Sequence, residues 1–149
     1  MSHAIIRFAT LADEAKIFPL LTALMEGELV GDTPIEQSGA ARNVFRDLLM
    51  SERGSVIVFE VDGDVLGVVT SSYAPAIRYD GIYARMEELV VDDKARGTGA
   101  GMMLVKAAIE EAKRRGCSLI TLYSREHTRA FYEKAGFRYT GPELHRAID

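Results

Sequence analysis

One glycine-rich stretch constrains the fold of this chain more than any other feature. Its residues are Arg96, Gly97, Thr98, Gly99, Ala100 and Gly101. The stretch lies between an apolar run that ends at Val91 and a long helical pattern that begins near Ala100. A glycine turn from a strand into a helix leaves several backbone N–H groups without partners, and together with the helix dipole they favour an anion. Because glycine has no side chain, a phosphate can approach these amides closely. The stretch therefore predicts a phosphate-binding loop, to which Arg96 adds a positive charge.

Two common phosphate-binding loops do not fit this stretch. The dinucleotide fingerprint G-x-G-x-x-G needs a third glycine, but the chain has Met102 or Leu104 there, depending on the starting glycine. A Walker A loop needs a glycine followed by a lysine, and the sequence contains no such pair. The pattern that remains is Arg-x-x-Gly-x-Gly, formed by Arg96, Gly99 and Gly101.

The composition is that of an ordinary globular protein, and it excludes some partners. The chain has 149 residues, which predicts one domain spanning residues 1–149. Its net charge of -4 argues against a nucleic-acid partner, which normally requires a basic patch. The single cysteine, Cys117, cannot form an internal disulfide, which favours a reducing compartment. With no signal-peptide pattern, no apolar stretch long enough for a membrane and no metal-ligand spacing, we expect a cytoplasmic protein without membrane or metal partners.

Apolar periodicity and turn residues predict the order of helices and strands. Thr10 and Asp13 have the spacing of a capping box ahead of a first helix, within which Pro19 predicts a kink or break. Residues 33–36 predict the start of a second helix, and Asp62-Gly63 predicts a hairpin turn. Strands are predicted at 4–8, 55–61, 64–72, 83–92, 119–124, 137–140 and about 144–148, helices at about 11–24, 34–51, 100–115 and 128–135, and a loop at 74–81. This order indicates an α+β fold with a largely antiparallel sheet.

Three segments, in order, resemble the GCN5-related N-acetyltransferase (GNAT) superfamily. Residues 87–97 look like the strand that leads into the pyrophosphate loop of that family, and Arg-x-x-Gly-x-Gly is similar to the loop itself. The helix that ends at Gly116 follows, and residues 130–137 are similar to the tyrosine helix of the family and its next strand. Asp93 stands where the family often has proline, which leaves the loop intact. The resemblance covers about the last two-thirds of the chain.

The resemblance implies a fold and a bound acyl donor. It implies a GNAT-like, acyl-CoA N-acyltransferase fold of α+β class, with a central, mostly antiparallel mixed sheet flanked by about four helices. Two neighbouring strands would splay apart after Val91 and Ser124 to admit acetyl-CoA or CoA, whose pantetheine arm would bond the free strand backbone. The cofactor-binding residues implied are Leu89, Val90, Val91, Arg96, Gly97, Thr98, Gly99, Ala100 and Gly101.

Glu87 and Glu88 are the candidate general bases. An alkylammonium is mostly protonated at neutral pH, so a carboxylate must accept a proton before the amine can attack. Side chains alternate along a strand, so only one of the two should face the cleft. Glu87 shares its parity with Leu89 and Val91, and we prefer it. A bulge in this strand, which the family has, would switch the assignment to Glu88.

Tyr132 matches the family tyrosine that protonates the departing CoA thiolate. A phenol with a pKa of about 10 is a suitable proton donor to a thiolate. The alternative is an aromatic of the core that packs beside Phe131 and Phe137.

The acceptor side is the least determined part of the sequence. The expected substrate contacts are Glu28, Arg78, Tyr79 and His145. The resemblance implies transfer of an acetyl group from acetyl-CoA to a primary amine, by direct attack in a ternary complex. The acceptor would be a small amine, an amino acid, an aminoglycoside-like compound or a protein amine, and a small molecule is favoured. Alternatives are a non-catalytic acyl-CoA sensor and an unrelated nucleotide-binding domain. Many members of the family pair, so a homodimer is one candidate assembly.

Overall fold

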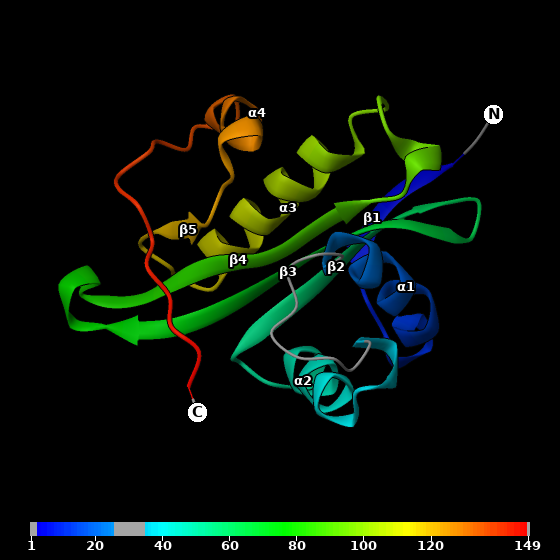
Figure 1. Cartoon of the computed structure of the whole chain (residues 1–149), viewed down its shortest axis with the longest axis horizontal. Coiled ribbons are helices and arrows are strands. Elements are labelled where there is room, and N and C mark those ends of the chain that lie inside the picture. Colours follow the sequence, from blue (N-terminus) through cyan, green and yellow to red (C-terminus); the bar gives the residue numbers. More distant parts are fainter. Residues whose placement is uncertain (1–2, 26–34, 149) are drawn as a thin grey trace.

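The computed structural model describes residues 3–25 and 35–148, which form one five-stranded sheet with helices on both faces (Figure 1). The strands are β1 (Ala4–Phe8), β2 (Gly54–Val61), β3 (Asp64–Ala76), β4 (Gly81–Val91) and β5 (Ile120–Leu122). The α-helices of this described part are α1 (Glu14–Met25), α2 (Gly39–Met50), α3 (Ala100–Arg114) and α4 (Arg129–Glu133). The strands follow one another in sequence order, antiparallel from β1 to β4 and parallel between β4 and β5. The predicted α+β class and the mostly antiparallel sheet are confirmed.

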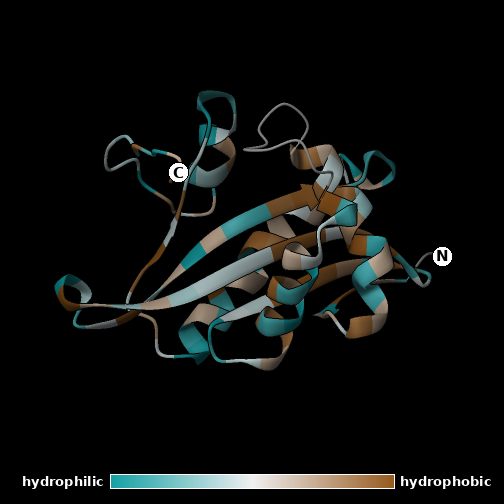
Figure 2. Cartoon of the chain, turned by 60° about the horizontal axis from the view of Figure 1, so that its bottom comes forward, coloured by the Kyte–Doolittle hydropathy of each residue, from teal (hydrophilic) through white to brown (hydrophobic). Residues whose placement is uncertain are grey.

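The central strands are apolar on both sides because helices cover both faces. In β2, Val56 and Val58 pack toward α1 and α2, whereas Ile57 and Phe59 pack toward α3. This explains why β2 is a continuous apolar run rather than an alternating one. Figure 2 shows that hydrophobic residues dominate where the helices cover the strands and become fewer along the projecting β3–β4 hairpin.

The first two helices differ from their predictions at one point each. A break at Pro19 is wrong, because α1 runs on to Met25 with that proline inside it. Ile17, Leu20 and Leu21 are buried against the sheet on both sides of the proline, and this packing outweighs one lost hydrogen bond.

The predicted start of α2 falls partly outside the described residues. The helix itself begins at Gly39, where the Oγ of Ser38 accepts the N–H of Ala41 at 3.1 Å.

The loop predicted at 74–81 is wrong, because β3 and β4 continue there as a long hairpin. Their register extends to Ala76 opposite Gly81, and Pro75 lies opposite Ile82. β2 begins at Gly54, which pairs with Ser72, and the N–H of Tyr73 still donates to Arg53, so beyond Tyr73 β3 is an edge strand on that side. A proline is tolerated on such an edge because no neighbouring strand needs its missing N–H.

The two strands predicted near the C-terminus are also wrong. Within the described residues, the chain from Phe137 to Ile148 forms no strand. Gly141 has a φ of +143° and is followed by Pro142, which has no N–H to donate. Leu144 is 92% exposed, so this segment buries little apolar surface that would fix a strand pairing. Glu143 instead forms an ion pair with Arg85, in which Nη2 of the arginine lies 2.5 Å from Oε1 of the glutamate. This ion pair ties the segment to β4.

A partly buried ion pair fixes β1 to the turn that precedes α1 and gives a prediction for stability. Arg7 donates to both carboxylate oxygens of Asp13, at 2.8 and 2.9 Å, and the N–H of Thr10 donates to Asp13 at 2.8 Å, which completes the predicted capping box. Mainly because of Arg7, the pKa of Asp13 falls from 3.8 to about 2. A lowered carboxylate pKa stabilises the fold above the unfolded pKa, and the contribution disappears as the pH falls through the folded pKa.

We therefore expect Asp13→Asn to lower the free energy of unfolding at pH 7 by about 2 kcal/mol. Urea unfolding of the wild type and the variant, followed by circular dichroism at several pH values, measures this difference. The difference should remain constant down to about pH 4 and then close toward pH 2, because protonation removes the charge of Asp13 from the wild type too. A difference that stays the same at pH 2 would contradict the assignment.

Candidate active site

β4 and β5 separate partway along their length, which leaves one edge of β4 open. β5 pairs with β4 only where Ile120–Leu122 lies beside residues 84–86, and β4 then continues to Val91 (Figure 1). The N–H of Asp92 donates to Leu66 on the β3 side. Because backbone groups alternate along a strand, the N–H and C=O of Leu89 and Val91 point away from β3, into the opening. The strands therefore diverge as predicted, although their pairing ends earlier than the expected points at Val91 and Ser124.

The glycine loop between β4 and α3 presents free amides to open space. Gly97 and Gly99 have φ angles of +77° and +86°, and Gly99 is the N-cap of α3. A Cβ placed on either glycine would meet no atom within 4 Å. Within the described residues, five N–H groups of this loop donate to no protein acceptor. They belong to Gly97, Gly99, Ala100, Gly101 and Met102. This arrangement fits a bound diphosphate.

Gly101 and Arg96 have roles that differ from those of the two open glycines. A Cβ on Gly101 would lie 3.3 Å from the ring of Phe131, so this glycine lets α4 pack closely against the start of α3. The Nε of Arg96 lies 2.9 Å from a carboxylate oxygen of Asp93, and both side chains are largely exposed. An exposed pair of this kind is weak, so Arg96 can exchange Asp93 for an anionic ligand at little cost.

A bulge in β4 places both candidate glutamates on the same face of the sheet. Thr70 lies opposite Glu88 and Ser71 lies opposite Met86, so Glu87 is the extra residue. Glu87 accepts a hydrogen bond from the hydroxyl of Ser72 at 2.7 Å, and Glu88 accepts one from the hydroxyl of Thr70. Thr70 and Ser72 are two residues apart on β3 and therefore share a face.

This face is the one that α1 and α2 cover, whereas Leu89 and Val91 pack toward α3. The predicted alternation, with Glu87 on the face of Leu89 and Val91, is therefore wrong, and the bulge is the reason.

The two glutamates have different electrostatic surroundings. Burial raises the pKa of Glu88 to about 7, and the negative charge of Glu87 adds to this effect. The side chain of Glu87 is 41% exposed and lies 3.4 Å from the Nε of Arg85. A carboxyl group with a pKa near 7 is suited to accept a proton at neutral pH.

Tyr132 lies on the opposite side of the sheet from the glutamates, among the residues that pack near α3. Its ring contacts those of Phe131 and Phe137, with centroid distances of 5.0 and 5.9 Å. It packs against the same buried cluster as Leu89 and Val91. Burial raises the pKa of Tyr132, which keeps the phenol protonated. Its hydroxyl donates to no group among the described residues, so it is available to a ligand.

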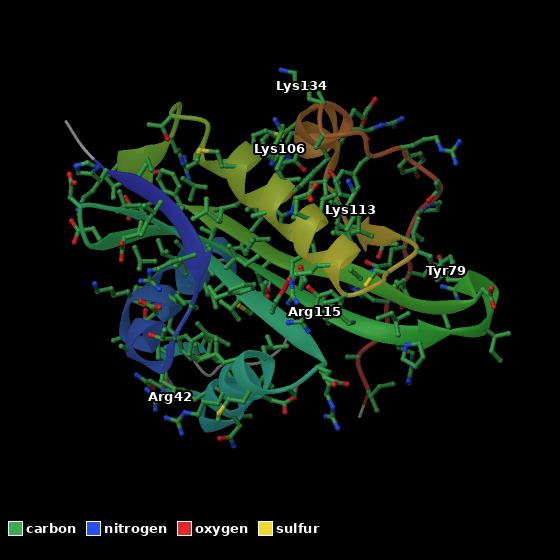
Figure 3. All side chains as sticks on the ribbon, turned by 180° about the vertical axis from the view of Figure 1, so that it is seen from behind. Arg42, Tyr79, Lys106, Lys113, Arg115 and Lys134 are labelled. Carbon is green, nitrogen blue, oxygen red and sulfur yellow. The ribbon has the colours of Figure 1, made fainter. Side chains whose placement is uncertain are left out.

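The structure places two of the four predicted acceptor contacts, Arg78 and Tyr79, away from Glu88. Arg78 stacks on Tyr79, with its guanidinium 4.5 Å from the ring centroid, at the far tip of the β3–β4 hairpin (Figure 3). At about 3.3 Å per residue along β4, this tip lies roughly 20 Å from Glu88. His145 is exposed in the C-terminal segment, and Glu28 lies outside the described residues. These four residues stay predictions.

Sequence reasoning missed the β3 hydroxyls and Arg85, which surround the glutamates. Thr70 and Ser72 have the alternation of one strand face, which is a signal that the sequence does contain. Their position opposite Glu88 and beside Glu87 depends on the β3–β4 register, and the bulge hides that register from the sequence.

Two further findings concern ligands and membranes. Within residues 3–25 and 35–148, no group of three or more His, Cys, Asp or Glu side chains is arranged to hold a metal ion. In the same part of the chain, no helix combines the length and apolar character required to cross a bilayer.

The acetyltransferase (GNAT) family model matches residues 21–137 of this chain. The chain belongs to the GNAT family. This GNAT chain is 32% identical over 84 residues to a glucosamine 6-phosphate N-acetyltransferase of Trypanosoma brucei brucei, a match that covers 56% of the chain and 57% of that protein. It is 38% identical over 61 residues to glucosamine 6-phosphate N-acetyltransferase 1 of Oryza sativa subsp. japonica, which covers 41% of the chain and 37% of that protein. The GNAT chain thus spans about half the length, or less, of these curated relatives.

Solved structures resemble the GNAT chain over nearly its whole length. A transcriptional regulator from Bacillus halodurans C-125 superposes with a TM-score of 0.82 at 27% identity, over 98% of this chain and 100% of that one. Together with the family match over residues 21–137, this superposition shows that the sheet that opens after Met86 and the loop before α3 belong to a GNAT fold.

Proposed function

We propose that this protein transfers the acetyl group of acetyl-CoA to the primary amine of a small molecule, by direct attack in a ternary complex. One observation supports this more than any other. The open edge of β4 has free loop amides at its end and, at its bulge, a half-buried carboxyl group with a pKa of about 7. An anion site and a proton acceptor thus lie on the same strand.

The residues present fit acetyl-CoA. The five free amides from Gly97 to Met102 would hold the diphosphate, with Arg96 and the dipole of α3 adding positive charge. The outward backbone groups of Leu89 and Val91 would bond the pantetheine amides as an added strand would. When bound, acetyl-CoA supplies the acetyl group as a reactive thioester.

Glu88 is the general base of this proposal. Its carboxylate accepts a proton from the ammonium of the acceptor, which frees the nitrogen lone pair for attack. We assign this role to Glu88 rather than to Glu87, because Glu87 is more exposed and is already paired with Arg85 and Ser72. The N–H of Val91, which points into the opening, would stabilise the oxyanion that develops during attack.

Tyr132 is the general acid of this proposal. Its hydroxyl has no protein partner in the described part of the chain, and its raised pKa keeps the proton in place until a strong base such as a thiolate appears. We expect Tyr132→Phe to lower kcat about 10- to 100-fold while the affinity for acetyl-CoA stays the same. Steady-state kinetics and calorimetric titration with acetyl-CoA measure the two quantities. An unchanged kcat would assign Tyr132 to the core alone.

The acceptor is the open part of the proposal. Two relatives are named glucosamine 6-phosphate N-acetyltransferases, which makes that amino sugar the first compound to test. A panel of amino sugars, aminoglycosides, amino acids and amines, assayed by release of the CoA thiol, tests the proposed activity. We expect turnover of at least one amine. Tight binding of acetyl-CoA without turnover of any amine would favour an acyl-CoA sensor instead. A homodimer and a cytoplasmic location stay predictions.

A further inference from the structure

We propose that Thr70 is a positioning residue that holds the Glu88 carboxylate in the orientation in which it accepts the proton of the amine. This inference rests on the proposed function, because it concerns the base of that same reaction. Thr70 belongs to β3 and lies directly opposite Glu88 in the antiparallel register. Its side chain is not a surface group, since the residue is only 3% exposed.

The hydroxyl of Thr70 makes two hydrogen bonds to one and the same residue. Its oxygen accepts the backbone N–H of Glu88 at 3.1 Å, and its proton is donated to Oε2 of Glu88. A hydroxyl has a single proton. Because the N–H of Glu88 occupies a lone pair of the Thr70 oxygen, the proton of that hydroxyl is directed toward the carboxylate. The Glu88 side chain is thereby tied to its own backbone through Thr70. Oε2 is occupied by this bond, and Oε1 is left to receive the proton of the substrate.

The bulge gives Thr70 a task that a regular strand would not need. Glu87 and Glu88 project from adjacent positions onto one face, so their carboxylates repel each other. Ser72 and Arg85 hold Glu87 on one side, and Thr70 holds Glu88 on the other. The two carboxylates are thus fixed by separate partners and kept in different orientations.

Few other charges in the described residues act on Glu88. Arg85 is shared between Glu87 and Glu143, and the facing residues of β3, Thr70 and Ser72, are neutral. On α1, which packs against β4, Glu14 pairs with Arg42 and Arg46, and Lys16 donates to the carbonyl of Gly63. On the opposite face, Glu111 of α3 pairs with Arg114 and Arg115. The Thr70 hydroxyl therefore contacts the Glu88 carboxylate without competition from a neighbouring cation, whereas burial and the charge of Glu87 raise the pKa of that carboxyl group.

Thr70→Val tests this role, because valine keeps the shape of threonine and removes the hydroxyl. Loss of a donor to a carboxylate disfavours the charged form, so the pKa of Glu88 should rise by about 1 pH unit. Carboxyl ¹³C NMR titration of protein labelled at glutamate measures this midpoint directly, and Glu88→Gln identifies the signal. The acidic limb of the kcat/KM profile should move up by the same amount, which lowers activity at pH 6 about tenfold.

Two control variants make the test specific, and a third variant repeats the deletion. Thr70→Ser keeps the hydroxyl and should restore both the midpoint and the rate profile. Ser55→Ala removes another buried strand hydroxyl, which is bonded to Tyr73 at 2.9 Å and lies on β2, two strands away from Glu88, and it should leave the midpoint unchanged. Thr70→Ala serves as a second deletion of the hydroxyl if the valine variant does not fold.

The NMR midpoint separates the two proposals because it needs no turnover. An unchanged midpoint in Thr70→Val, or an equal rise in Ser55→Ala, would overturn the role of Thr70. Normal acetyl transfer alongside that result would leave the proposed function standing. A raised midpoint in a protein whose wild type acetylates no amine would contradict the proposed function and support the contact.

Discussion

Gly99→Val should lower the affinity for acetyl-CoA at least about 100-fold. Gly99 faces open space in front of the free amides, so a valine side chain there would occupy the place of the diphosphate. Loss of two hydrogen bonds to a charged group, at about 1.5 kcal/mol or more each, corresponds to this factor. Isothermal titration calorimetry with acetyl-CoA measures the affinity directly.

Gly116→Val is the matched control for this variant. Gly116 lies at the other end of α3 with a φ of +82°, close to the +86° of Gly99, and it also has no atom within 4 Å of an added Cβ. Both variants should lose about 1–2 kcal/mol of stability, because valine is strained in a left-handed backbone conformation. Only Gly99→Val should lose affinity. Equal affinities in the two variants would mean that the loop does not hold the diphosphate.

Glu88→Gln should lower kcat about 100-fold or more and leave the affinity for acetyl-CoA nearly intact. The amide of glutamine cannot accept the proton of the amine, and general-base catalysis contributes at least about that factor. The pKa of Glu88, at about 7, adds a prediction for the wild type. Glu88 is protonated and inactive as a base below this value, so kcat should rise as the pH increases through about 7 and then level off. Steady-state rates from pH 5.5 to 9 measure both effects.

Glu87→Gln is the matched control, because it changes the neighbouring carboxylate in the same way. It removes a negative charge beside Glu88, so the pKa of Glu88 should fall and the acidic limb should move to lower pH. Its kcat at pH 8 should stay within about threefold of the wild type. If Glu87→Gln lost the activity and Glu88→Gln kept it, Glu87 would be the base, as simple strand alternation predicts.

The glycine loop was predictable because its function depends on local backbone chemistry. Gly97 and Gly99 adopt positive φ angles, and the amides beyond them lack partners at the start of α3, features that follow from glycine and from helix ends. The buried strands were predictable for a similar reason, since a short continuous apolar run is typical of a strand that is covered on both faces.

The face of the glutamates was not predictable, because a bulge is a property of two strands. The extra residue at Glu87 appears only when β3 and β4 are aligned, and the bulge moves Glu87 from the face of Leu89 to the face of Glu88. The role of Thr70 depends on the same alignment. The false strands near the C-terminus have a related cause, because apolar residues such as Leu144 predict a strand only where a neighbour exists to pair with it.

A crystal structure of the protein with bound CoA tests the central claim most directly. We expect the diphosphate oxygens within about 3.2 Å of the amide nitrogens between Gly97 and Met102, and the pantetheine arm along the open edge of β4 at Leu89 and Val91. CoA bound elsewhere on the protein, with these amides unengaged, would contradict the claim.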